Sequence, residues 1–229
     1  GNLAAQLAHE IKNPMTAIDT FFQLLPERWE DAEFRTSFLG IARSESLRIH
    51  GLLKQFLELS AQREAVAETT DLHLLIEALL TFLQPQATRS GVRMECRALA
   101  TRTLFRMVAD KVRQALLNIL MNALDAAPGG STVVVVTSDA QGTGGRPAVC
   151  IEIIDEGPGI PSELRQQVFK PFFTRHAKPT GANGTGLGLF IARQNINDHG
   201  GEIGVFEREG GGTCFRILLP VERRHASSP

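Results

Sequence analysis

The sequence predicts an α+β protein in which a two-helix hairpin precedes an α/β sandwich domain. Apolar residues recur every three or four positions through the first quarter of the chain, as they do in amphipathic helices. Beyond it, short β-branched runs are grouped with helical segments, a pattern that favours a sandwich over repeated βαβ units. We expect the hairpin over residues 1–66 and the sandwich over residues 67–229.

The first helix is predicted over residues 3–25, and a second follows the PERWED segment, with Asp31 as its N-cap, running to about Arg63. Two long helices with a short connection form an antiparallel hairpin. Such a hairpin buries little surface, so we expect it to dimerise into a four-helix bundle. The apolar stripe of the first helix consists of Leu3, Leu7, Ile11, Met15, Ile18, Phe22 and Leu25.

A polar stretch, REAVAETTD at residues 63–71, is the predicted domain boundary and ends in a Thr70/Asp71 helix cap. Further helices are predicted over residues 72–88, 110–127 and 187–199. Strands are predicted at VRMECRAL, TLFRMV, STVVVVTS and AVCIEIID, with GEIGVFER and GTCFRILLP as a closing hairpin.

Composition excludes several classes of protein. With 43% hydrophobic and 21% charged residues the chain is globular, and a net charge of -1 offers no basic field for nucleic acid or anionic lipid. Cys96, Cys150 and Cys214 suggest neither a disulfide framework nor a CxxC metal pair, and indicate a reducing cytosol. The chain has no signal peptide and no apolar run of about 18–20 residues. We expect a cytoplasmic fragment whose membrane attachment, if it has one, lies in a sensor region outside this chain.

His9 lies opposite the apolar stripe of the first helix. Each helical residue advances by about 100°, so His9 stands roughly 200° from both Leu7 and Ile11. Glu10 is adjacent, and Asn13 follows on the same face one turn later. Pro14 interrupts this helix at a cost of ~3 kcal/mol, because it lacks an N–H group and crowds the carbonyl of residue 10. The segment alone favours a solvated histidine and a tolerated proline; the alternative is a nucleophile on a turn that can bend.

Two later clusters, NILMNALDAA and DEGPGI, have the residues of a nucleotide site. Asn118 and Asn122 share a helical face, and amide oxygens suit a Mg²⁺ that keeps water and phosphate as its other ligands. Asp155 ends a strand and can accept a hydrogen bond from an adenine amine, while Gly157 and Gly159 permit close backbone approach. In isolation, an Asn pair is more often a capping pair, and an Asp-Gly turn is an ordinary turn.

The clusters FKPFFT and GTGLGL flank a polar segment. Gly184, Gly186 and Gly188 precede a helix, so that free amides and the helix dipole favour phosphate. Their spacing fits neither GxGxxG nor GxxxxGK[ST]. The segment from Thr174 to Gly184 is predicted to be a mobile lid. Three nearby phenylalanines either anchor this lid or belong to the core: Phe169, Phe172 and Phe173. Its basic residues either reach a phosphate or are solvated: Arg175, His176 and Lys178.

Taken in order, these motifs resemble the catalytic core of sensor histidine kinases of two-component systems. HEIKNP resembles the H box, NILMNALDAA the N box, DEGPGI and GTGLGL the two glycine boxes, and FKPFF the F box. GGGT at residues 210–213 resembles a further glycine segment. The resemblance covers nearly the whole chain and implies a dimerising hairpin followed by an ATP-binding sandwich of the Bergerat type, as in gyrase, Hsp90 and MutL.

The resemblance implies that His9 is the phosphoacceptor, that Glu10 is the base or orienting carboxylate, and that Asn13 orients a water for phosphatase activity. It implies ATP and Mg²⁺ as cofactors, with Asn122 as metal ligand, and a response regulator receiver domain as partner of the homodimer. The implied ATP-binding residues are Asn118, Asn122, Asp155, Gly157, Gly159, Lys170, Phe173, Arg175, Gly184, Thr185, Gly186, Leu187 and Gly188.

The chain departs from the family pattern at Asp125, where many relatives have a basic or amide residue, so phosphate contacts would rest on Lys170, Arg175 or His176. Two alternative functions remain. An ATPase clamp would have a glutamate to activate water where this chain has Asn118. A scaffold or phosphatase-only protein would not need the combination of His9, Asn122 and Asp155.

Overall fold

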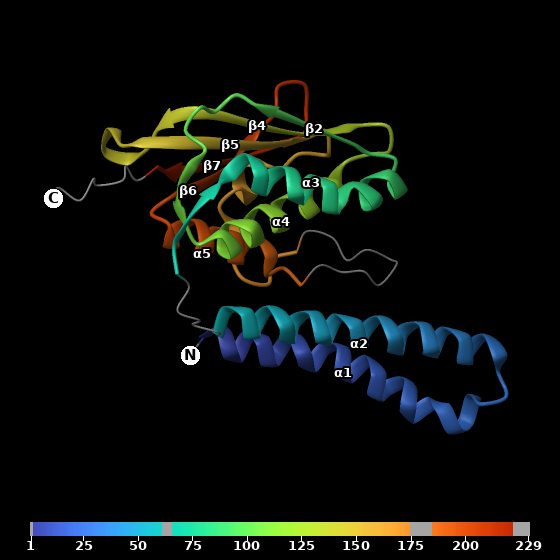
Figure 1. Cartoon of the computed structure of the whole chain (residues 1–229). Coiled ribbons are helices and arrows are strands. Elements are labelled where there is room, and N and C mark those ends of the chain that lie inside the picture. The colour runs from blue at the N-terminus through green and yellow to red at the C-terminus, as the bar shows by residue number, and fades with distance from the viewer. Residues whose placement is uncertain (1, 61–65, 175–184, 222–229) are drawn as a thin grey trace. The chain divides into compact units, whose positions relative to one another are not determined.

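The computed structural model describes residues 2–60, 66–174 and 185–221 (Figure 1). These residues form two compact units, one made of residues 1–63 and 170–188 and the other of residues 64–169 and 189–229. Within the described ranges, no helix is both long enough and apolar enough to span a membrane.

The first unit contains the predicted helical hairpin. Helix α1 spans Asn2–Arg28 and helix α2 spans Ala32–Ser60. Asp31 caps α2, because its Oδ1 accepts hydrogen bonds from the backbone N–H groups of Glu33 and Phe34, both at 3.0 Å. The predicted cap is therefore confirmed. The predicted boundary at residues 66 and 67 falls between the end of α2 and the first strand.

The phase of the apolar stripe on α1 differs from the prediction. Pro14 is buried, whereas Met15 and Phe22 are 45% and 55% exposed. Phe21 packs near Phe34, with ring centroids 5.7 Å apart, while Phe22, although mostly exposed, makes an edge contact with Phe38 at 5.1 Å. The reason is geometric: at 100° per residue, positions 14 and 21 lie closer to the line through Leu7 than positions 15 and 22 do. The apolar stripe predicted from the sequence is therefore too wide, because it includes residues that are mostly exposed as well as residues that α2 covers.

The second unit is built on a five-stranded sheet with the order β2-β4-β5-β7-β6. Strands β2 and β4 are parallel, and the other neighbours are antiparallel. The predicted closing hairpin is confirmed by the pairing of β6 with β7. The bounds are Arg93–Ala98 for β2, Thr132–Gln141 for β4, Pro147–Asp155 for β5, Glu202–Glu207 for β6 and Thr213–Pro220 for β7.

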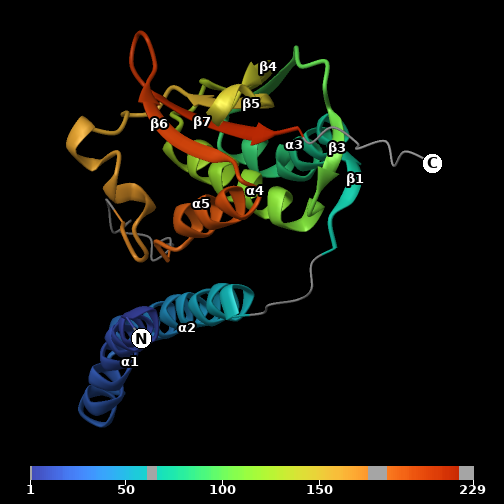
Figure 2. The same ribbon diagram turned by 90° about the vertical axis from the view of Figure 1, so that its left-hand side faces the viewer.

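Three helices cover one face of this sheet, as Figures 1 and 2 both show. They are α3 at Leu72–Arg89, α4 at Ala109–Ala126 and α5 at Gly188–Asp198. Alternate residues of the central strands, such as Val133 and Val135 on β4, are buried. A sheet with a single helical layer on one face is the predicted sandwich.

One strand of the structure is absent from the sequence prediction. Strand β1, Glu68–Asp71, pairs antiparallel with β3, Leu104–Met107, in the polar segment that was predicted to be a connection. Its sequence, ETTD, has no apolar alternation, so the strand depends on its partner. Asp71 ends β1 and caps α3 as predicted, accepting a hydrogen bond from the N–H of His73 at 2.8 Å. Short 3-10 helices occur at Thr143–Gly145, Ser162–Leu164 and Gln167–Phe169.

Candidate active site

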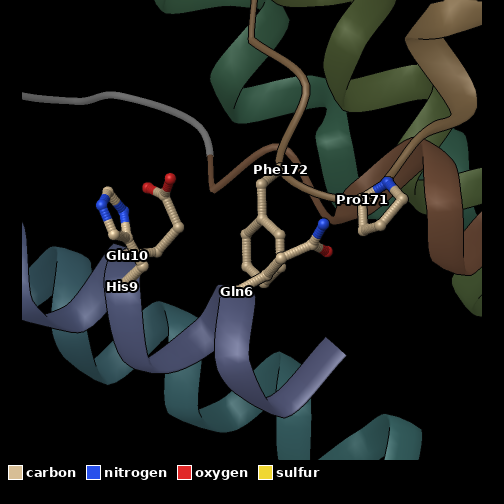
Figure 3. A pocket seen from close by; sticks show the side chains of 5 residues that line it. All are labelled: Gln6, His9, Glu10, Pro171 and Phe172. Atoms are coloured by element: carbon tan, nitrogen blue, oxygen red, sulfur yellow. The ribbon is translucent and has the colours of Figure 1, made fainter. Parts of the chain in front are cut away.

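His9 is exposed on α1, as its position opposite Leu7 predicts. Within the first unit it lines a pocket with Gln6, Glu10, Pro171 and Phe172. Figure 3 shows the side chains of His9 and Glu10 next to one another on α1. An exposed imidazole beside a carboxylate can accept a group at one ring nitrogen while it loses a proton to the carboxylate.

Glu10 makes a contact that the sequence did not reveal. Arg48 on α2 donates from Nη2 to Oε2 of Glu10 at 3.3 Å, and its Nη1 lies 3.7 Å from Oε2 of Glu45. The carboxylate beside His9 is therefore held from the second helix. The two residues are far apart in the sequence, and only the register of the hairpin brings them together.

Asn13 is exposed one turn after His9. Pro14, the next residue, is buried, and the helix continues past it to Arg28. The hydroxyl of Thr16 donates to the carbonyl of Lys12, one turn earlier, at 2.9 Å. The proline therefore has a packing role, and its effect on the His9 turn stays a prediction.

Asp155 is the buried charge of the second unit. It ends β5, is 1% exposed, and accepts a hydrogen bond at Oδ1 from the N–H of Gly157 at 2.8 Å. Thr213, its partner on β7, bonds the carboxylate through its backbone and its hydroxyl. Burial raises the pKa of the Asp155 carboxyl above its ordinary value, and these hydrogen bonds lower it by less. The strand end thus presents a fixed acceptor in a dry environment.

The glycines around Asp155 are required by close packing. A Cβ at Gly157 would lie 2.8 Å from the carbonyl oxygen of Ala126 at the end of α4. A Cβ at Gly212 would lie 2.1 Å from the carbonyl oxygen of Asp155. Gly159 has φ of 71° and faces Gly212. The loop after β5 therefore lies tightly between the end of α4 and the start of β7, and Gly212 of the GGGT segment packs against the backbone of Asp155 and Gly159.

The two asparagines of α4 differ in environment. Asn118 is half-buried and accepts from Nε2 of Gln114 at 3.4 Å, whereas Asn122 is exposed, as is Asp125. Asn122 lies one turn before Ala126, so it occupies the same end of α4 as the Asp155 loop. Within the described ranges, no group of three or more His, Cys, Asp or Glu side chains could hold a metal ion. The residues present fit a Mg²⁺ bound through an amide oxygen, water and phosphate.

The second glycine box has a packing explanation of its own. Gly186 has φ of 68°, and a Cβ there would lie 2.5 Å from the carbonyl carbon of Phe172, which itself has φ of 63°. Thr185, Leu187 and Gly188 lead into α5 as predicted, and Leu187 is fully buried.

The other residues predicted around this glycine box have separate environments. Lys170 is exposed and Phe173 is half-buried. Phe169 is core, in an edge contact with Phe215 at 6.5 Å. Arg175 and Gly184, with His176 and Lys178, lie outside the described residues.

A buried aspartate at a strand end, glycine turns and an asparagine-bearing helix are the features expected of an ATP-binding domain of the kind shared by kinases and ATPase clamps. The family model of "Histidine kinase-, DNA gyrase B-, and HSP90-like ATPase" matches residues 107–223, and that of the "His Kinase A (phospho-acceptor) domain" matches residues 1–65. The chain belongs to the histidine kinase family and is the catalytic core of such a kinase.

Curated relatives match almost the whole chain. Sporulation kinase E of Bacillus subtilis (strain 168) is 33% identical over 97% of this chain and 29% of its own length. Signal transduction histidine-protein kinase AtoS of Escherichia coli (strain K12) is 33% identical over 96% of this chain and 35% of its own length. The chain therefore spans about a third of the length of these relatives.

Solved structures agree with the fold. Histidine kinase ThkA, in a crystal structure with the response regulator protein TrrA, is 25% identical, with a TM-score of 0.76 over 97% of this chain and 62% of that one. Mycobacterial sensor histidine kinase MprB is 28% identical, with a TM-score of 0.56 over 69% of this chain and 99% of that one.

Proposed function

We propose that this chain transfers the γ-phosphoryl group of ATP to His9 and then passes it to an aspartate of a response regulator receiver domain. The observation that carries the proposal is the pairing of an exposed His9–Glu10 couple with a separate Asp155 nucleotide site in one chain. A clamp-type ATPase would need the Asp155 nucleotide site but not the exposed His9–Glu10 couple.

In the first step, an imidazole nitrogen of His9 forms a bond to the γ-phosphorus as the bond to the ADP oxygen breaks. Glu10 accepts the proton that the imidazole loses, so the products are ADP and a phosphohistidine whose imidazole ring is neutral and whose phosphoryl group is anionic. In the second step, the regulator's carboxylate attacks the same phosphorus and His9 leaves. A histidine can serve as both acceptor and donor because the phosphoramidate bond is readily cleaved.

We assign nucleotide binding to residues around Asp155, to the asparagines of α4 and to the glycine box. Asp155 would accept a hydrogen bond from the adenine amine, and Gly157 and Gly159 would let the base approach the backbone. Asn122 would bind Mg²⁺ and Asn118 would support the metal or the phosphates; bound Mg²⁺ would neutralise developing charge on the phosphates. Further phosphate contacts would come from Lys170, Arg175 and the amides of residues 184–188.

Asn13 supports a second activity toward the same regulator. Its exposed amide lies one turn from His9, where it could orient a water for hydrolysis of the regulator's acyl phosphate. The complex of ThkA with TrrA supports a receiver domain as the partner of this hairpin. Because ATP and such regulators are cytoplasmic, we place the reaction in that compartment.

We also propose that the hairpin forms a homodimer. Large apolar side chains of both helices remain exposed, and a second copy would cover them in a four-helix bundle. They include Met15, Leu39, Leu53 and Leu57.

Incubation with γ-labelled ATP and Mg²⁺, followed by acid and alkali treatment, tests the phosphotransfer. The expected label is stable to alkali, labile to acid and absent from His9→Ala. Label that survives in His9→Ala would refute the assignment of the phosphoacceptor. Asn13→Ala should slow regulator dephosphorylation while autophosphorylation is retained, and equal loss of both would refute the separate role of Asn13.

A further inference from the structure

Arg48 is a charged residue between the two helices of the hairpin that the proposed reaction does not use. Its Nη2 donates to Oε2 of Glu10 on α1 at 3.3 Å, while Nη1 lies 3.7 Å from Oε2 of Glu45, one turn earlier on α2. One guanidinium group thus bridges two carboxylates that belong to different helices. One of these carboxylates is the proposed base.

The bridge contributes little to the stability of the hairpin. The side chains of Arg48, Glu10 and Glu45 are 23%, 27% and 20% exposed, so water still screens their charges. Fixing three long side chains also costs conformational entropy. An ion pair of this kind typically adds little measurable stability. Stability alone is therefore a weak reason for this arrangement.

The bridge also has unsatisfied buried atoms. Arg48 Nε and Glu45 Oε2 are buried and find no hydrogen-bond partner among the described residues. A buried polar atom without a partner costs free energy, and such atoms in native proteins need an explanation. The contact with Glu10 is the shorter of the two made by the guanidinium, so the group is directed at the carboxylate beside His9.

A general base must lie within hydrogen-bond reach of the proton that it accepts. A glutamate on an open helix face samples several rotamers, and few of them bring an oxygen near the neighbouring residue. Arg48 restricts this freedom by holding Oε2, which leaves Oε1 to accept the proton of His9. An arginine suits this task because its planar fork fixes the direction of a carboxylate better than an ammonium group does.

We propose that Arg48 is a positioning residue, which holds the Glu10 carboxylate ready for proton transfer from His9 while Glu45 anchors the other side of the guanidinium. This inference rests on the proposed function, because it concerns the base of the same reaction. In this role Arg48 acts through its contact with Glu10.

A double-mutant cycle on the full chain tests the proposal. Single-turnover autophosphorylation is measured for the wild-type chain, Arg48→Gln, Glu10→Gln and the double variant, at several ATP concentrations. Arg48→Gln should lower the rate constant about tenfold, part of the 10²–10⁴-fold that a positioned base supplies, with KM for ATP unchanged. In the Glu10→Gln background, Arg48→Gln should have no further effect, because the residue that it positions is gone.

Two further variants separate positioning from a structural role. Arg48→Lys keeps a cation near Glu10 and should recover part of the lost rate, while Arg43→Gln, at an exposed arginine of the same helix, should match the wild type. Thermal unfolding and sedimentation should show the same stability and assembly for all of them. If Arg48→Gln lowers the rate equally with Glu10 and with Glu10→Gln, or if the rate falls in parallel with the melting temperature, the positioning role of Arg48 is overturned. The proposed function would stand in either case. A wild-type chain without label at His9 would overturn the proposed function and this inference together.

Discussion

The hairpin and the sandwich differ in how completely they bury their apolar side chains. In the hairpin, the residues fully buried between the two helices are few, among them Leu7, Phe34 and Leu52, and large apolar side chains stay exposed along both helices. In the sandwich, strands and helices enclose residues such as Ile119, Ile151 and Ile217 with no exposure at all. The hairpin thus depends on a partner for its core, while the sandwich forms its own.

The two regions also place their chemistry differently. His9 is exposed on the surface of a helix, as the proposed exchange between a nucleotide and a regulator requires. Asp155 is buried and held by hydrogen bonds from Gly157 and Thr213. An acceptor that exchanges partners has to be accessible, whereas a residue that selects one base benefits from a dry, fixed environment.

The largest expected effect is on nucleotide binding by the sandwich. In Asp155→Asn, the oxygen must still accept from the N–H of Gly157, so the amide nitrogen takes the other position and cannot accept from adenine. Affinity for ATP should fall ~1000-fold, because the adenine amine would face a donor and lose its hydrogen-bond partner. Sites built to hydrogen-bond a ligand discriminate by about 10⁴–10⁵-fold against a mismatched group, so the expected loss lies below that range. Titration with a fluorescent ATP analogue measures this. Asp110→Asn, at an exposed carboxylate on α4, should bind normally.

The hairpin should be more sensitive than the sandwich to charges placed on exposed leucines. Leu39→Glu with Leu53→Glu should raise the dimer dissociation constant at least ~100-fold, since each buried leucine is worth about 1.5–3 kcal/mol. Sedimentation equilibrium provides the measurement. The matched change Leu99→Glu with Leu104→Glu, at exposed leucines of the sandwich, should leave the dimer intact. Equal weakening by both pairs would remove the distinction drawn between the two regions.

The pH dependence of nucleotide binding should reveal the buried charge. Because burial raises the pKa of Asp155, affinity should be complete above that pKa and fall about tenfold per pH unit below it, starting at a higher pH than an exposed aspartate would cause. Stability without nucleotide has the opposite sign: because the folded-state pKa is raised, the sandwich gains stability as pH falls through that pKa toward the lower pKa of the unfolded chain, and loses it as pH rises again. Binding and thermal unfolding across the acidic range should diverge. Parallel curves would contradict the role of Asp155.

The smallest expected effects are changes in the free energy of unfolding caused by substitutions at His199 and His50. In the sandwich, Nε2 of His199 accepts from the N–H of Val108 at 3.0 Å and Nδ1 contacts the carbonyl of Asn195 at 2.6 Å, which links α4 to α5. His199→Ala should destabilise the isolated sandwich by ~1–2 kcal/mol, because it leaves the N–H of Val108 without its partner. Urea denaturation is the measurement. His50→Ala, at an exposed histidine of α2, should cost less than ~0.5 kcal/mol in the whole chain.

Local sequence signals predicted most of the elements. Asp31 and Asp71 cap helices where expected because capping depends on neighbours two or three residues away. Strand β1 was missed because its four polar residues gain strand structure only from β3. The stripe on α1 was assigned too broadly, because Met15 and Phe22 are as apolar as the residues that α2 covers. Hydrophobicity alone does not say which surface covers a side chain.

By itself, the sequence determined the order of the elements, the family and the set of residues expected at the site, because each motif is a short stretch whose residue types and spacing limit its chemistry. Only the tertiary structure decided which distant residues meet. It brought Arg48 to Glu10 and Thr213 to Asp155, and it showed that Gly157, Gly186 and Gly212 are glycines because the backbone passes too close for a side chain. Such contacts depend on helix register and strand pairing, which are set by the burial of the whole core rather than by any local pattern.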